Sequence, residues 1–165
     1  MYLEDELSAI QTANLLKAKK LIKYEAESKC TKRQKPVVLW FYGKTGTGKT
    51  RTAVEIAEEA GKEYWLSSGE DLKWFDGYNG QPYAIIDDFR KGMCKFNYLL
   101  RLLDRYSMAV QVKGGWTKWN PLVIIITCPV CAREAWQYFD KDGETQDWDH
   151  IEQLERRIDQ EIEFN

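Results

Sequence analysis

The chain has 165 residues, which suits one domain, and its 44% hydrophobic and 30% charged residues are typical of a globular protein. Its net charge of −2 gives no overall positive field, so any contact with nucleic acid must come from a local basic patch. No apolar run approaches the ~18 residues of a membrane-spanning helix, so no membrane partner is expected.

Residues 1–35 are predicted to form a charged helical segment followed by a linker. An incomplete apolar stripe is marked by Leu3, Leu7, Ile10 and Leu21. The basic run KCTKRQKP (29–36) ends in proline, as linkers often do. The helical segment could be a small bundle packed on the core or an oligomerisation collar, and the sequence hardly separates the two. Residues 36–165 form the second, larger predicted unit.

That larger unit begins with a phosphate-binding loop between a strand and a helix. The apolar run VVLWFY (37–42) is typical of a buried parallel strand, and RTAVEIAEEAG (51–61) has helical apolar spacing and ends in glycine. The segment between them fits G-x-x-x-x-G-K-[ST], whose backbone N–H groups form a nest for phosphates. The candidate nucleotide-binding residues are Gly43, Lys44, Thr45, Gly46, Thr47, Gly48, Lys49 and Thr50.

The last two residues of this loop have specific expected roles. Lys49 would reach the β- and γ-phosphates, and the Thr50 hydroxyl would bind Mg²⁺. The helix amino end behind the loop also favours an anion. A dinucleotide-binding loop is excluded because its glycines would be spaced G-x-G-x-x-G.

Strands and helices alternate through the rest of the chain. We expect strands at 63–68, 83–89 and 121–128, and helices at 95–106 and 150–160. An aromatic loop occupies 70–82, and residues 109–119 alternate around Gly114-Gly115, which indicates a two-residue hairpin turn. The pattern predicts an α/β fold, in which a parallel sheet flanked by helices carries one inserted β-hairpin.

Two carboxylates, Asp87 and Asp88, end the apolar run of the strand at 83–89. A strand that delivers carboxylates to the mouth of a phosphate loop places them beside the metal. One carboxylate would hold the Mg²⁺ shell, and the other could polarise the water that attacks the γ-phosphate. This favours hydrolysis, although a small P-loop kinase stays possible; a GTPase would carry an N-K-x-D box, which the sequence lacks.

Seven motifs follow one another within residues 37–160: GKTGTGKT, LKWFDGYNGQ, AIIDDF, LLRLLDRY, VKGG, IIIT and RRI. Their order and spacing resemble the superfamily 3 helicase domain of the replication-associated (Rep) proteins of circular single-stranded DNA viruses, such as circoviruses and nanoviruses, and of related plasmids. The resemblance implies an AAA+-like P-loop NTPase that uses ATP and Mg²⁺. It also implies a homo-oligomer, a hexameric ring, that moves on single-stranded DNA in a host nucleus or, for a plasmid, in the cytoplasm.

The resemblance also implies roles for individual residues. The loop Gly43 to Thr50 would hold the nucleotide, with Thr50 and Asp87 at the metal and Asp88 at the attacking water. The hairpin around Lys113 and Gly114 resembles the family's DNA-gripping pore loop, with Lys118 as a further candidate. The resemblance gives Arg156 and Arg157 the role of the arginine finger that completes a neighbouring subunit's site. Trp116 and Trp119 are expected to pack the hairpin rather than to stack on bases.

Two departures from the family pattern stand out. Many members read Ile-Thr-Ser-Asn after the fourth strand, where this chain reads Ile126-Thr127-Cys128-Pro129. Proline offers no side-chain donor to orient the attacking water, so Thr127 takes that role or hydrolysis is slow, which would leave a ring-forming DNA-binding module with an impaired ATPase. A nicking endonuclease with a His-x-His site is excluded by the single histidine, so we expect a helicase portion that moves or unwinds DNA without cutting it.

Overall fold

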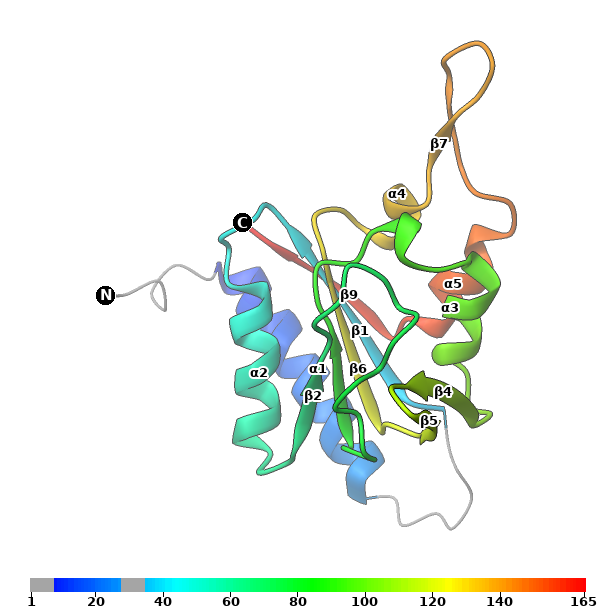
Figure 1. Cartoon of the computed structure of the whole chain (residues 1–165). Coiled ribbons are helices and arrows are strands. Elements are labelled where there is room, and N and C mark those ends of the chain that lie inside the picture. Colours follow the sequence, from blue (N-terminus) through cyan, green and yellow to red (C-terminus); the bar gives the residue numbers. More distant parts are fainter. Residues whose placement is uncertain (1–7, 28–34) are drawn as a thin grey trace.

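The computed structural model describes residues 8–27 and 35–165 (Figure 1). Leu3 and Leu7 of the predicted stripe lie outside these residues. The elements are α1 (Ala9–Glu27), β1 (Val37–Gly43), α2 (Lys49–Glu59), β2 (Tyr64–Leu66), β3 (Tyr83–Ile86), the 3₁₀ helix η2 (Lys91–Met93), α3 (Phe96–Leu102), β4 (Met108–Val112), β5 (Gly115–Trp119), β6 (Val123–Cys128), α4 (Ala132–Ala135), β7 (Tyr138–Phe139), β8 (Thr145–Gln146), α5 (Ile151–Arg157) and β9 (Gln160–Phe164). None of the helices in the described part of the chain is long and apolar enough to cross a membrane.

Five parallel strands form the central sheet in the order β2-β3-β6-β1-β9. Because all of them run in one direction, their carboxyl ends, including the ends of β1, β3 and β6, meet at one edge. The phosphate loop and the two carboxylates follow β1 and β3 at this edge. The predicted α/β P-loop NTPase fold with a parallel sheet and an inserted hairpin is confirmed.

Alternate residues of each strand enter two separate cores. In β1, Val37, Leu39 and Phe41 pack with α1 and α2, while Val38 and Trp40 pack with α3, α5 and the β4–β5 hairpin. These strands are apolar on both faces because helices or the hairpin cover both. Figure 1 shows α1 and α2 on one side of the sheet and α3 and α5 on the other.

Helix α1 lies on the sheet through a different face from the predicted one. It buries Leu15, Ala18 and Ile22 against β1 and β9, and the buried Gln11 amide donates a 2.6 Å hydrogen bond to the Glu163 carbonyl. Ile10 is 74% exposed, so its predicted place in the apolar stripe was wrong. The stripe was predicted from large apolar residues alone, so it left out the buried positions Gln11 and Ala18. The boundary at residue 35 and the collar role remain predictions.

The carboxyl-terminal helix is shorter than predicted, and a strand follows it. Helix α5 ends at Arg157, after which β9 pairs with β1 in parallel, with Ile162 opposite Phe41. The predicted helix at 150–160 therefore extends too far, since the helix ends at Arg157 and β9 begins at Gln160. The signal was present, since Ile162 and Phe164 are buried while Glu161 and Glu163 face outward, with the period of two of a strand.

The β4–β5 hairpin forms where predicted, with its turn shifted by one residue. Val112 pairs with Gly115, so Lys113 and Gly114, not Gly114 and Gly115, are the turn residues. A second hairpin, formed by β7 and β8, was not predicted. Figure 1 shows this second hairpin standing clear of the body beyond α4.

Candidate nucleotide and nucleic-acid sites

The phosphate loop forms an open concave surface in front of α2. Gly46 and Gly48 have φ angles of 84° and 87°, and a Cβ added to either glycine would meet nothing within 4 Å. Such left-handed positions point successive N–H groups to one side, which is the geometry of an anion nest. The Lys49 ammonium curls back over this loop, where it donates to the carbonyls of Gly43 and of Lys44, the latter at 3.2 Å. Burial lowers the pKa of Lys49 from its ordinary value.

Gly43, at the start of the loop, is required for a different reason. Its φ is 144°, and a Cβ there would lie 2.1 Å from the carbonyl oxygen of Phe164 in β9. The Gly43→Ala substitution should therefore lower the free energy of unfolding by about 1–3 kcal/mol beyond the strain of a positive φ, because backbone must move to relieve the overlap. Urea unfolding measures this directly.

Gly61→Ala is the matched control for that substitution. Gly61 also has a positive φ, 65°, but an added Cβ would meet nothing within 4 Å. It should cost only the backbone strain of a left-handed alanine, about 1–2 kcal/mol at most. Equal losses for the two variants would show that the approach of β9 to Gly43 is unimportant.

Three oxygen-bearing side chains converge beside the loop. The Asp87 Oδ1 atom accepts hydrogen bonds from the hydroxyls of Thr50, at 2.5 Å, and of Thr127, at 2.9 Å. The Asp87 backbone N–H donates to the Ser67 hydroxyl at 2.8 Å. Hydroxyl and carboxylate oxygens at the mouth of a phosphate loop are the ligand types that Mg²⁺ prefers. The residues present therefore fit a magnesium ion with a nucleotide.

Asp88 points its carboxylate to the surface from a strained position. Its φ is 51°, which is unusual for a residue other than glycine, and its N–H donates to the Thr127 hydroxyl at 2.8 Å. The carboxylate is exposed and pairs with Arg90 at 3.0 Å. The single hydroxyl proton of Thr127 is donated to Asp87, and its oxygen accepts from the Asp88 N–H. For Thr127, this arrangement favours the positioning of the two aspartates over the predicted orientation of the attacking water.

The Cys128-Pro129 departure lies at the same edge of the sheet. The buried Cys128 thiol donates to the Phe89 carbonyl at 3.4 Å, and burial raises its pKa to about 11. Pro129 lines a pocket of about 420 Å³ together with Lys44 and Thr47 of the phosphate loop. A residue without a donor thus stands where the family pattern places an asparagine, next to the loop.

The tip of the β4–β5 hairpin is anchored by the aromatic loop. The Lys113 N–H donates to Asp76 Oδ1 at 2.7 Å, and the Lys113 ammonium lies 3.9 Å from Asp76 Oδ2. The Phe75 N–H donates to the Gln111 carbonyl at 2.8 Å, and the Trp65 indole donates to the Asp76 carbonyl at 2.9 Å. The Lys113 side chain is nevertheless 85% exposed. Sequence reasoning missed Asp76 because nothing local in the sequence links it to residue 113.

The two hairpin tryptophans face opposite ways. Trp119 is fully buried against Trp65, Phe75 and Tyr78, so the predicted packing role is confirmed for it. Trp116 is 68% exposed, so the predicted packing role is wrong for this residue. The reason is the alternation of a strand, which places Trp116 and Lys118 on the outer face.

Arg156 and Arg157 differ in how firmly they are held. The Arg157 guanidinium donates to the Gln153 carbonyl at 2.9 Å and to Asp104 at 3.3 Å, which ties α5 to the end of α3. Arg156 is exposed on the same helix. Two residues after Arg157, the Asp159 N–H donates to the Val38 carbonyl at the amino end of β1, whereas the phosphate loop follows the carboxyl end of β1. The end of α5 therefore lies toward the opposite edge of the sheet from the phosphate loop of its own chain.

Comparison with known proteins gives consistent relatives. A family model described as RNA helicase matches residues 39–129. The replication-associated protein of Goose circovirus is 42% identical over 93 residues, covering 56% of this chain and 30% of that protein. The replication-associated protein of Human associated cyclovirus 1 is 34% identical over 110 residues, covering 64% of this chain and 38% of that protein.

A shorter match reaches another viral protein. The genome polyprotein of Human klassevirus 1 is 38% identical over 63 residues, which cover 34% of this chain and 3% of the polyprotein. The alignments with the two replication-associated proteins above span 30% and 38% of their lengths. The resemblance predicted from the ordered motifs is confirmed by these matches.

Proposed function

The chain belongs to the RNA helicase family, and on this premise we propose that it is the ATP-hydrolysing motor of a replication initiator that moves on single-stranded DNA. Family membership alone supports a helicase-type enzyme that uses a nucleotide. The choice of ATP with Mg²⁺, of single-stranded DNA and of a hexameric ring is our proposal. A location in a host nucleus or in the cytoplasm stays a prediction.

One observation carries the catalytic part of this proposal. Thr50 of the phosphate loop and Thr127 at the end of β6 share Asp87 Oδ1 as their acceptor, so three elements meet at one carboxylate oxygen. Mg²⁺, held by Thr50 and Asp87, would neutralise charge on the β- and γ-phosphates. Lys49 and the loop N–H groups bind those phosphates, and the exposed Asp88 carboxylate polarises the attacking water.

Completion of the site requires a second subunit. Transition-state charge on the γ-phosphate is stabilised by a guanidinium, and this chain has both candidate arginines on the far side of the sheet from α2. Arg156 is exposed, whereas Arg157 is held by Gln153 and Asp104. We therefore assign the finger to Arg156 and the positioning of α5 to Arg157.

The outer face of the β4–β5 hairpin supplies the contact with nucleic acid. Lys113 at the turn and Lys118 on β5 provide positive charge, and the exposed Trp116 lies between them in sequence. Lysines that meet phosphates, with an aromatic ring on which a base can stack, are the usual parts of a single-strand binding surface. Because the net charge of the chain is −2, contact with nucleic acid depends on a local basic patch of this kind.

Lys113→Ala should keep basal hydrolysis and lose its stimulation by single-stranded DNA. Each phosphate contact on a single strand contributes about 0.7 to the slope of log affinity against log salt, so the slope should become shallower. Binding titrations at several salt concentrations measure this. An unchanged slope with normal stimulation would move the contact away from Lys113, with Lys118 as the next candidate.

Lys62→Ala is the control for this variant, since Lys62 is an exposed lysine that follows α2 and is not part of the hairpin. Asp76→Asn gives an opposite expectation. The amide oxygen can still accept from the Lys113 N–H, but a negative charge near the bound phosphate is removed. Affinity should rise about two- to fivefold, as expected for one surface charge.

Two competing functions are separated by their products. A P-loop kinase would transfer phosphate to an acceptor rather than release it, and a DNA-binding module with an impaired site at Pro129 would bind without turnover. The family description favours RNA as an alternative strand, so single-stranded RNA belongs in every binding series. If RNA binds more tightly and stimulates hydrolysis more strongly than DNA does, the proposed strand is RNA.

A further inference from the structure

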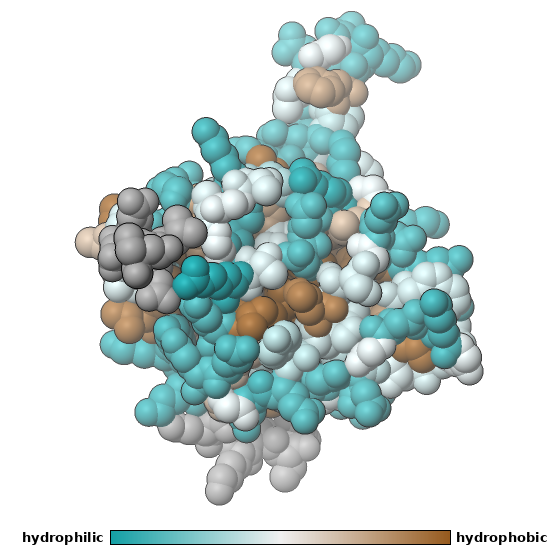
Figure 2. All heavy atoms as spheres, turned by 60° about the vertical axis from the view of Figure 1, so that its left-hand side comes forward, coloured by the Kyte–Doolittle hydropathy of each residue, from teal (hydrophilic) through white to brown (hydrophobic). Residues whose placement is uncertain are grey.

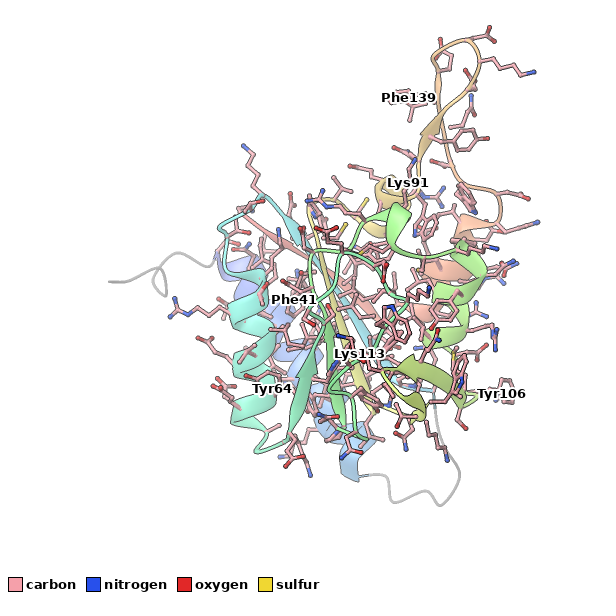
Figure 3. All side chains as sticks on the ribbon, viewed as in Figure 1. Phe41, Tyr64, Lys91, Tyr106, Lys113 and Phe139 are labelled. Carbon is pink, nitrogen blue, oxygen red and sulfur yellow. The ribbon has the colours of Figure 1, made fainter. Side chains whose placement is uncertain are left out.

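The β7–β8 hairpin, residues 138–146, forms an arm that the proposed motor leaves without a role. Figure 1 and Figure 3 show it extending beyond α4, with Phe139 labelled on its shaft, and Figure 2 shows brown atoms among teal ones where it stands clear of the body. Phe139 is 77% exposed and Tyr138 is 42% exposed. An exposed aromatic ring on a projecting element offers apolar area that a binding partner would remove from water.

Hydrogen bonds within the arm hold its shape. The Asp140 Oδ1 atom accepts from the N–H groups of Asp142 and Glu144, each at 2.9 Å, and its Oδ2 atom accepts from the Gln146 amide at 2.9 Å. These hydrogen bonds, the one from the Glu144 N–H first, lower the pKa of Asp140. The turn is thus fixed by its own carboxylate, and Phe139 is presented on a stiff element.

The base of the arm is fixed to the body. Arg133 binds Asp147 at 2.6 Å on one side and Glu155 of α5 on the other, and the Lys91 ammonium donates to the Gln137 carbonyl at 2.6 Å. An arm that is stiff and fixed at its base loses little entropy on binding, which favours a docking function.

The charge of the arm indicates its partner. Its turn, residues 140–144, carries three carboxylates and one lysine, which disfavours nucleic acid and favours a basic surface. Such a surface exists on this chain. Between Ala9 and Lys23, α1 has four lysines and no acidic residue. Lys20 lies one helical turn (i, i+4) from Leu16, which is 53% exposed, and Lys17 follows Leu16 directly; both lysines are exposed.

The arm and α1 lie on opposite faces of the sheet. The tryptophans at the base of the arm, Trp136 and Trp148, pack with the α3 and α5 core, whereas α1 packs with the other core. A contact between such opposite surfaces is head-to-tail, the kind that closes into a ring when the rotation allows. We propose that the arm docks on α1 of a second copy of this chain, with Phe139 covering Leu16 and with Asp142 and Glu144 facing Lys17 and Lys20.

The contact deepens the assembly part of the proposed function, but its test measures association alone. Sedimentation velocity over a concentration series should show oligomers of the chain in the presence of a non-hydrolysed nucleotide. Phe139→Ala should weaken association at least about tenfold, as expected for a buried aromatic anchor. Tyr106→Ala, which removes another exposed ring (67% exposed) that is not part of the arm, should leave association unchanged.

A charge exchange makes the partner specific. Asp142→Lys with Glu144→Lys should weaken association, and so should Lys17→Glu with Lys20→Glu. Mixing the two charge-reversed proteins should restore a mixed contact, and combining all four changes in one chain should restore assembly. All four side chains are exposed, so we expect each variant to fold, and thermal melts test this.

Three results would overturn the proposal: a wild-type chain that stays monomeric, reversals that leave assembly unchanged, or a combined exchange that fails to restore it. None of them depends on hydrolysis. Loss of phosphate release with intact assembly would instead count against the motor function and leave this contact standing.

Discussion

Lys49→Ala should abolish nucleotide hydrolysis and tight nucleotide binding. Lys49 is the cation of the loop that reaches toward the phosphates, and in the free protein its ammonium is held over the loop by the carbonyls of Gly43 and Lys44. Burial lowers the pKa of Lys49, and an anion bound beside the ammonium would act in the opposite direction by favouring its charged form. Phosphate release and equilibrium nucleotide binding measure the two effects separately.

Lys62→Ala, the same change at an exposed lysine beyond the end of α2, serves as the control and should keep full activity. Unfolding midpoints should stay close between the two variants, since Lys49 is the first residue of α2 and is not part of either core. Retention of more than a small fraction of hydrolysis by Lys49→Ala would count against the assignment of the loop.

Arg156→Ala should bind nucleotide normally and hydrolyse it about 10³-fold more slowly, as the loss of an arginine finger does. Its helix, α5, lies across the sheet from α2, so in the proposed function its guanidinium would act in a neighbour's site. Mixing Arg156→Ala with Lys49→Ala should restore part of the activity, because some interfaces then pair an intact loop with an intact arginine. Steady-state phosphate release across mixing ratios measures this.

Arg157→Ala is the matched control on the same helix. Arg157 bonds to Gln153 and Asp104, so its removal should lower the unfolding midpoint more than Arg156→Ala does. If mixing Arg156→Ala with Lys49→Ala restores nothing while assemblies still form, Arg156 does not act in a neighbour's site. If Arg157→Ala is the variant that is rescued, the two assignments are exchanged.

Local patterns in the sequence predicted the parts of the fold that depend on local physics. Residues 37–61 predicted a strand, a phosphate loop and a helix, because apolar spacing and glycine placement determine the local backbone structure within a few residues. The hairpin and the strand before Asp87 followed in the same way. The element after Arg157 was missed because a five-residue strand at a sheet edge leaves only the alternation of Ile162 and Phe164.

Contacts between distant residues could not be predicted. Asp76 holds the turn at Lys113 across 37 residues of sequence, and Thr127 reaches Asp87 across 40. These pairs exist only because the sheet and the aromatic core bring their strands together. The RRI motif likewise predicted both arginines as candidates for the finger. Only the packing of α5 near the end of α3 distinguishes Arg157, which binds Asp104, from the exposed Arg156.

In the proposed function, the energy of nucleotide hydrolysis is used to move on a single strand. The most direct measurement is the release of free phosphate from ATP with Mg²⁺, without nucleic acid and with increasing single-stranded DNA. We predict measurable release that the strand stimulates and that Lys113→Ala leaves at its basal rate. No release, or release that single-stranded DNA and RNA both leave unchanged, would show that the chain is not a motor driven by nucleotide hydrolysis.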